Sequence, residues 1–117
     1  MRESREMYLE TIYVLTQKLD CVHAIDVCQH MGFSKPSVSR AVGLLKKEGL
    51  IYTEKDSSLH LTEEGQKKAE KIYERHTTLT SFLIKIGVSP ETASEDACRI
   101  EHHISDETLE AIKNQIK

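Results

Sequence analysis

Three side chains of types that commonly bind metal ions lie close together near residue 100 of this 117-residue sequence. Cys98, Glu101 and His102 are spaced at i, i+3 and i+4, so a helix would place a sulfur, a carboxylate and an imidazole on one face. Such a face could hold a divalent cation. Taken singly, these residues have plainer interpretations, with Cys98 as core filler and Glu101 as an exposed helix charge.

Two further segments carry candidate ligands. Met7 and Glu10 form an i, i+3 pair beside the apolar stripe of the first expected helix, and His76 falls within the stripe of a long helix. Three helices could therefore converge on one cation. Taken singly, Met7 would fill the core, Glu10 would be a solvated charge and His76 would be a buried, hydrogen-bonded histidine.

The other cysteines and histidines show no such spacing. Cys21 and Cys28 flank an expected loop, and His103 points about 100° around the helix from His102. Three cysteines are an odd number without a disulfide framework, which favours a reducing compartment. The sequence contains no secretory signal peptide and no membrane-spanning run, so we expect a cytoplasmic protein without a membrane partner.

A basic segment in the first half of the chain suits a polyanion such as DNA. Residues 33–55 carry a net charge of +3, whereas residues 62–117 carry −3. Residues 34–40 open an expected helix with hydroxyls and cations, which can bond phosphates and base edges beside the helix N-terminus. The residues expected to contact DNA are Ser34, Lys35, Pro36, Ser37, Ser39, Arg40, Lys46, Lys47 and Lys55. The alternative is a solvated basic face that serves protein contacts.

Apolar periodicity and helix-capping residues predict a mainly α-helical chain with one small hairpin. The expected elements are helices over 3–19, 24–30 and 35–47, strands over 50–53 and 58–61, and helices over 62–86, 89–104 and 105–117. In the first helix the apolar stripe runs from Tyr8 to Leu19, and in the second Ile25 and Cys28 are expected to point inward. Aliphatic packing must supply most of the core, because only 5% of the residues are aromatic.

The order of these elements predicts a winged helix-turn-helix. Two short helices joined by a turn at Gly32 are followed at once by a hairpin, and the second helix would enter the major groove. We therefore expect a winged helix-turn-helix DNA-binding domain over 1–62 and a helical metal-binding and dimerisation domain over 63–117. The apolar residues after Gly87 exceed what one small unit can cover, which favours a two-fold dimer.

Five stretches of the sequence resemble a known family. They span residues 6–13, 34–40, 49–51, 61–65 and 98–102, and they are similar to the diphtheria-toxin-repressor family of metal-dependent regulators. The resemblance implies a homodimer that binds a double-stranded DNA operator and represses metal uptake when Fe²⁺ or Mn²⁺ is abundant. Because the chain stops after the last dimerisation helix, it resembles the shorter manganese-regulator branch, which lacks a third, β-barrel domain.

The resemblance also implies a set of metal ligands, some shared by the whole family and others typical of one branch. The shared ligands are His76, Glu101 and His102; Met7 and Cys98 resemble the iron-sensing branch, and Glu10 the manganese-sensing branch. Thr80 and Ser94 stand where the iron branch has the glutamate and histidine of an ancillary site. The thioether and thiol are soft ligands and favour Fe²⁺, with Mn²⁺ as the alternative and Co²⁺, Ni²⁺ or Zn²⁺ able to bind in vitro.

Two other functions stand as alternatives. The first is a metal-independent winged-helix regulator, whose ligand-like residues only pack. The second is a metal hydrolase with Glu101 as base, which we do not expect because the sequence lacks a glycine-rich phosphate loop and an activated-nucleophile arrangement. We therefore expect a protein that is not an enzyme and has no small-molecule substrate.

Overall fold

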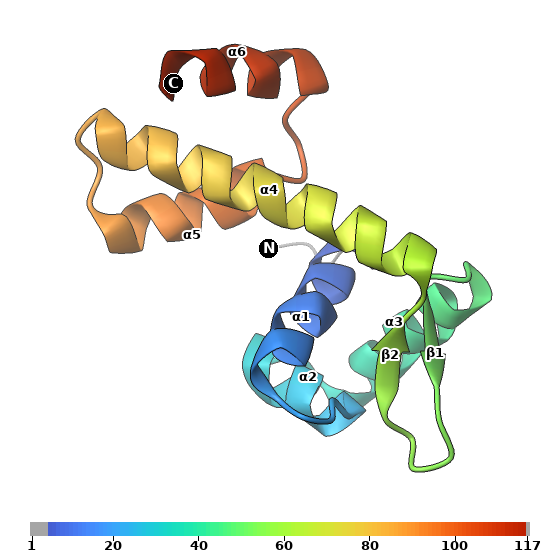
Figure 1. Cartoon of the computed structure of the whole chain (residues 1–117). Helices are drawn as coiled ribbons and strands as arrows, with labels where there is room; N and C mark the ends of the chain where they lie inside the picture. The colour runs from blue at the N-terminus through green and yellow to red at the C-terminus, as the bar shows by residue number, and fades with distance from the viewer. Residues whose placement is uncertain (1–4, 117) are drawn as a thin grey trace. The chain divides into compact units, whose positions relative to one another are not determined.

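In the computed structural model, which describes residues 5–116, the chain forms six helices and a two-stranded sheet. The elements are α1 (Arg5–Lys18), α2 (Ala24–Met31), α3 (Lys35–Lys47), β1 (Ile51–Thr53), β2 (Leu59–Leu61), α4 (Glu63–Lys85), α5 (Pro90–Ile100) and α6 (Asp106–Ile116) (Figure 1). They form two compact units, Met1–Glu70 and Lys71–Lys117, and α4 begins in the first and ends in the second. The mainly α-helical fold with a hairpin wing is confirmed.

The outermost ends of the expected elements fall at the chain termini. The expected start of the first helix at Glu3 and the expected end of the last helix at Lys117 lie outside the described residues. Between residues 5 and 116, no helix combines the length and the hydropathy needed to cross a membrane.

The first unit is built around α1, α2 and α3, which pack against one another. Each helix turns one apolar side inward at the spacing of an amphipathic helix. The residues that these three helices bury are Tyr8, Leu9, Ile12, Leu15, Val27, Val38, Ala41 and Leu45. Aliphatic side chains therefore supply nearly all of this core, as the composition predicts.

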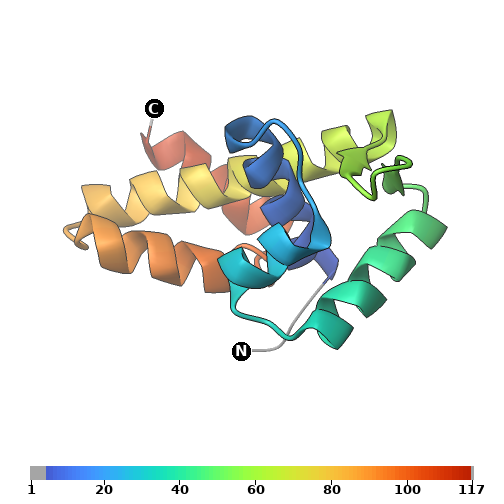
Figure 2. The same ribbon diagram turned by 90° about the horizontal axis from the view of Figure 1, so that it is seen from below.

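A tight turn joins α2 to α3. Gly32 ends α2 with a φ of 71°, a left-handed conformation that costs glycine little. Ser34 caps α3, because its hydroxyl oxygen accepts a hydrogen bond from the Ser37 backbone N–H at 3.3 Å. Pro36 follows in the first turn of α3, where its missing N–H leaves no helix bond unmade. Figure 2 shows the resulting helix-turn-helix, which the sequence predicts.

The hairpin that follows α3 has two strands of three residues each. The strands are antiparallel, with Tyr52 opposite His60. These two rings stack, with their centroids 5.2 Å apart. The Leu59 backbone N–H donates a hydrogen bond to the Val22 carbonyl oxygen at 2.7 Å, so β2 is also tied to the segment that precedes α2.

Polar side chains order the turn of the hairpin. The Ser58 hydroxyl and backbone N–H both donate to Asp56 Oδ1, at 2.5 and 3.0 Å, and these bonds hold the pKa of Asp56 below its usual value. The Nε2 atom of His60 lies 2.9 Å from Glu54 Oε1. Ser57, between Asp56 and Ser58, adopts a left-handed backbone conformation with a φ of 66°. The tip of the hairpin is therefore held by its own hydrogen bonds as well as by the short sheet.

Hydrogen bonds connect the start of α4 to Gly49 and Leu50, the two residues before β1. The Thr62 hydroxyl donates to the Gly49 carbonyl oxygen at 2.7 Å and accepts from the Gly65 backbone N–H at 3.0 Å. A Cβ atom on Gly65 would lie 1.9 Å from the Leu50 carbonyl oxygen. Only a glycine at position 65 allows the two stretches of backbone to approach this closely.

Two expectations about the first unit are wrong. Ile25 is 58% exposed, because it lies about 160° around the helix from Val27, the residue that α2 buries. Cys28 is half-buried, as expected. Leu19, the residue directly after α1, is 40% exposed.

The second unit consists of the end of α4 together with α5 and α6. One buried residue from each helix, Leu79, Ala97 and Leu109, forms its core, and Ile104 and Ile112 pack against this core. Three of the apolar residues that follow Gly87, namely Ala93, Ala97 and Leu109, are buried within the single chain and are not left for a partner.

Helix α5 ends at Ile100, sooner than the expected residue 104. The Glu101 backbone N–H still donates to the Ala97 carbonyl oxygen at 2.9 Å, which is the bond of a continuing helix. The N–H groups of His103 and Ile104 then both donate to the Ile100 carbonyl oxygen, which closes a turn before α6 begins. Glu101 and the two residues after it therefore belong to a turn.

The contact at Gly65 predicts opposite effects for two glycine substitutions. Gly65→Ala should lower the free energy of unfolding by at least about 2 kcal/mol, because the new methyl group overlaps the Leu50 carbonyl. Gly43→Ala should raise it by about 0.5–1 kcal/mol, because Gly43 lies inside α3 with open space around its Cα. Urea unfolding of both variants measures this, and equal effects would contradict the close approach.

Candidate metal centre

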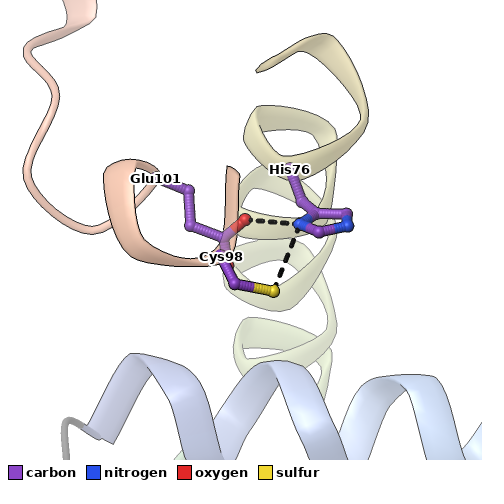
Figure 3. A group of neighbouring side chains, drawn as sticks. All are labelled: His76, Cys98 and Glu101. Atoms are coloured by element: carbon purple, nitrogen blue, oxygen red, sulfur yellow. Dashed lines mark hydrogen bonds and ion pairs between the residues drawn. The ribbon is translucent and has the colours of Figure 1, made fainter. Parts of the chain in front are cut away.

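Three predicted ligands converge in the second unit. His76 comes from α4, Cys98 from α5 and Glu101 from the position directly after α5, and their side chains point toward one another (Figure 3). His76 Nδ1 lies 3.0 Å from Glu101 Oε2 and 3.7 Å from Cys98 Sγ. One ligand atom from each residue lies within 4.8 Å of the other two.

These separations suit a bound cation. Metal–nitrogen and metal–sulfur bonds of about 2.0–2.3 Å place neighbouring ligand atoms about 3–4 Å apart. The donors are one nitrogen, one sulfur and one carboxylate oxygen, a mixed set that suits a divalent transition metal. His76, Cys98 and Glu101 could therefore hold such an ion with small side-chain movements.

Glu101 is the most deeply buried member of the group, with 1% of its surface exposed. A buried carboxylate is costly unless nearby donors and positive charge compensate for its lost hydration. His76 faces one carboxylate oxygen at 3.0 Å, and His102 Nε2 lies 3.2 Å from the other. The two imidazoles therefore enclose the carboxylate.

The same contacts change the protonation of His76. Hydrogen bonding with the Cys98 sulfur, and then with the Glu101 carboxylate, raises the pKa of His76 to about 10, although burial opposes the shift. The Nδ1 proton lies between the atoms that would bind a cation, and a histidine must lose such a proton to become a ligand. Metal binding at this position therefore competes with a proton.

The three remaining predicted ligands are His102, directly after Glu101, and Met7 and Glu10 on α1. His102 follows Glu101 in the turn after α5, and its side chain is 8% exposed. Met7 and Glu10 lie one turn apart on α1 in the first unit, and both are half-buried. Their part in the metal centre stays a prediction.

Neighbouring residues outside the predicted set have other roles. The Thr80 hydroxyl donates to the His76 carbonyl oxygen at 2.8 Å, which is a bond within α4. His103 is exposed, in agreement with its expected position away from the ligand face. Arg75, which no sequence pattern marks as part of the site, donates to the Glu101 carbonyl oxygen at 3.1 Å. Only its place next to His76 in the sequence could have pointed to it.

The predicted DNA-contacting residues all lie in the first unit, at the start and end of α3 and in the hairpin turn. Ser34 and Ser37 bond to each other across the helix cap at 3.0 Å, and Arg40 Nη2 donates to the Ser37 hydroxyl at 3.4 Å. The side chains that are exposed are Ser34, Lys35, Pro36, Ser39, Arg40, Lys46, Lys47 and Lys55. The exposed start of α3 thus combines hydroxyls with positive charge.

A winged helix-turn-helix followed by a helical unit with a cluster of metal-binding residue types is the arrangement expected of a metal-dependent DNA-binding regulator. Residues 1–59 match the iron dependent repressor N-terminal DNA binding domain, and residues 62–117 match the iron dependent repressor metal binding and dimerisation domain. The chain belongs to this family of metal-dependent repressors, and the resemblance to the diphtheria-toxin-repressor family is confirmed.

Individual relatives agree with the family. The chain is 38% identical over 112 residues to the transcriptional regulator MntR of Escherichia coli O6:H1. The matched region covers 96% of this chain and 72% of the relative. An HTH-type regulator of Methanocaldococcus jannaschii is 33% identical over 97% of this chain and 92% of its own length. The solved manganese regulator SloR is 28% identical, with a TM-score of 0.87 over 99% of this chain and 54% of its own. The chain spans about half the length of such solved structures.

The geometry predicts that Cys98 binds the metal through sulfur. The full chain titrated with Co²⁺ should develop a thiolate-to-metal charge-transfer absorption in the near ultraviolet, and Cys98→Ser should remove it because an alcohol is a poorer and harder ligand. Cys28→Ser, at the half-buried cysteine of α2, is the matched control and should keep the band. A band that survives in Cys98→Ser would exclude Cys98 from the centre.

Proposed function

We propose that this chain is a metal-activated transcriptional repressor. Loaded with a divalent metal, it binds a double-stranded DNA operator as a homodimer, and its place of action is the cytoplasm. The observation that carries the proposal is the convergence of His76, Cys98 and Glu101 in a chain whose other unit is a winged helix-turn-helix. Membership of the iron-dependent repressor family supports it.

The proposed mechanism is a coupling between the metal centre and the DNA-binding unit. A bound divalent cation supplies concentrated positive charge that holds several ligands at once. The second unit would provide the ligands His76, Cys98, Glu101 and His102, while Met7 and Glu10 would join them from α1 of the first. Ligands from both units make DNA affinity depend on metal, and metal affinity on DNA.

The proposed DNA contacts follow from the exposed surface of the first unit. The start of α3, with Lys35, Ser39 and Arg40, would enter the major groove and reach base edges. The N-terminal end of α3 and its capping serines would contact phosphate. Lys46, Lys47 and Lys55 would bind the backbone, where their charge adds affinity without specificity.

We propose the second unit as the dimer interface. Four large hydrophobic side chains of this unit are substantially exposed: Tyr73 at 39%, Ile84 at 43%, Ile86 at 61% and Ile100 at 37%. A second copy of the chain would cover such side chains, because homodimer interfaces are rich in apolar area. The match of residues 62–117 to a dimerisation domain supports this assignment.

We infer from the ligand chemistry that Fe²⁺ is the effector. A thiol from Cys98, with a thioether from Met7, softens the site and favours Fe²⁺ over Mn²⁺. The alternative is Mn²⁺, which is supported by relatives described as manganese regulators, such as SloR. Co²⁺, Ni²⁺ and Zn²⁺ serve as probes in vitro.

Metal should control operator affinity. On DNA selected from a random pool by the Co²⁺-loaded protein, Co²⁺ or anaerobic Fe²⁺ should tighten binding by roughly 5- to 150-fold over a chelated sample. Fluorescence anisotropy measures this at one fixed salt concentration, because phosphate contacts alone make affinity salt-dependent. His76→Ala should lose the metal response, and His103→Ala, an exposed histidine near the site, should keep it. Equal affinity with and without chelator would favour the metal-independent regulator.

Replacing the two sulfur ligands should shift the metal preference. The double variant Met7→Asp, Cys98→Glu has only nitrogen and oxygen donors, and harder donors favour Mn²⁺. It should therefore need less Mn²⁺, relative to Co²⁺, for half-maximal operator binding than the parent does. Cys21→Glu makes the same type of substitution as Cys98→Glu, with one added carboxylate, at an exposed cysteine of the first unit, and it should leave the ratio unchanged. An unchanged ratio in the double variant would remove the support for Fe²⁺.

A further inference from the structure

The turn that carries two candidate ligands is anchored by a side chain outside the ligand set. Glu101 and His102 lie where α5 has ended, so the helix no longer supplies hydrogen-bond donors for every carbonyl group there. Arg75 Nη1 donates to the Glu101 carbonyl oxygen at 3.1 Å. The ligand residue Glu101 is therefore held through its backbone as well as through its side chain.

The same guanidinium also holds the far end of the turn. Arg75 Nη2 lies 2.5 Å from Asp106 Oδ1, and Asp106 is the first residue of α6. The Arg75 side chain is only 18% exposed, whereas that of Asp106 is 73% exposed. One side chain of α4, next to His76 in the sequence, thus spans the turn from residue 101 to residue 106.

We propose that Arg75 is a positioning residue of the metal centre. Its fork of donors sets the backbone between Glu101 and Asp106, so that the Glu101 carboxylate already faces His76 before a metal ion binds. The inference rests on the proposed metal binding at this centre. Arg75 itself has no ligand role, because a guanidinium offers only donors.

The physical basis of the proposal is preorganisation. A turn held in one conformation has already lost the freedom that ligand residues otherwise lose when they close around an ion. Residues that orient metal ligands typically contribute 10- to 100-fold to metal affinity. The bond to the backbone carbonyl carries most of this effect, because the exposed pair with Asp106 is weakened by solvent.

The structure supplies a matched control for the loss of a link between α4 and α6. Lys113 of α6 pairs with Glu74, which precedes Arg75 on α4. Like the pair between Arg75 and Asp106, it joins these two helices. Neither Lys113 nor Glu74 is a member of the turn that carries Glu101 and His102. Lys113→Met therefore removes a link between the helices and leaves the anchor of the turn in place.

The test is a Co²⁺ titration of the full chain and its variants, followed by absorption and by competition with a chelator. Arg75→Met should bind Co²⁺ about 10- to 100-fold more weakly than the parent, with weaker d–d bands but a retained thiolate band. Asp106→Asn should lose less than about 5-fold, and Lys113→Met less than about 2-fold. Arg75→Lys should recover only part of the affinity, because an ammonium cannot span both acceptors as the fork does.

Thermal unfolding of the metal-free variants separates positioning from a general loss of stability. We expect Arg75→Met and Lys113→Met to unfold at similar temperatures while their Co²⁺ affinities differ. Parent-like affinity and spectrum in Arg75→Met would overturn the proposal, as would an equal loss in Lys113→Met. If Arg75→Met does not fold, the Co²⁺ affinity of Arg75→Lys tests the proposal instead. An affinity of Arg75→Lys equal to that of the parent would then overturn the proposal. A parent that shows no Co²⁺ spectrum would remove the proposed function together with this inference.

Discussion

The second unit depends on one constraint, the burial of the Glu101 carboxylate. Desolvation of such a charge costs several kcal/mol in a protein interior, so the surrounding residues must compensate for it. His76 does this at one carboxylate oxygen, and His102 Nε2 lies 3.2 Å from the other. Their positions require α4 and α5 to lie close together, and the contact of Leu79 with Ala97 and Leu109 maintains that packing. A small aliphatic core thus determines where the polar cluster can form.

Much of the architecture could be predicted because local signals decide it. Ser34, Pro36 and Gly32 mark the helix boundaries of the first unit through capping and backbone geometry, which act within a few residues. The spacing of Cys98 and Glu101 likewise predicts a shared face, since the Glu101 N–H still bonds as it would in a helix. These features need no knowledge of the tertiary fold.

The features that could not be predicted depend on contacts between distant residues. Helix α5 ends at Ile100, where the chain turns toward α6. No glycine or proline at this position predicts the end of the helix from the sequence. The exposure of Ile25 depends on which side of α2 faces the other helices. Arg75 bonds to a residue 26 positions away, and its type alone predicts only a surface charge. Periodicity identifies an apolar side but does not show which polar residues will meet.

The hairpin has a thermodynamic consequence for any encounter with DNA. Two strands of three residues are too short to be stable as an isolated sheet. This hairpin is nevertheless supported by the stack of Tyr52 on His60, the bonds from Ser58 to Asp56, and the bond from Leu59 to the segment before α2. A loop that is ordered before binding loses little conformational entropy when it docks. More of the contact energy of the wing is then retained as affinity.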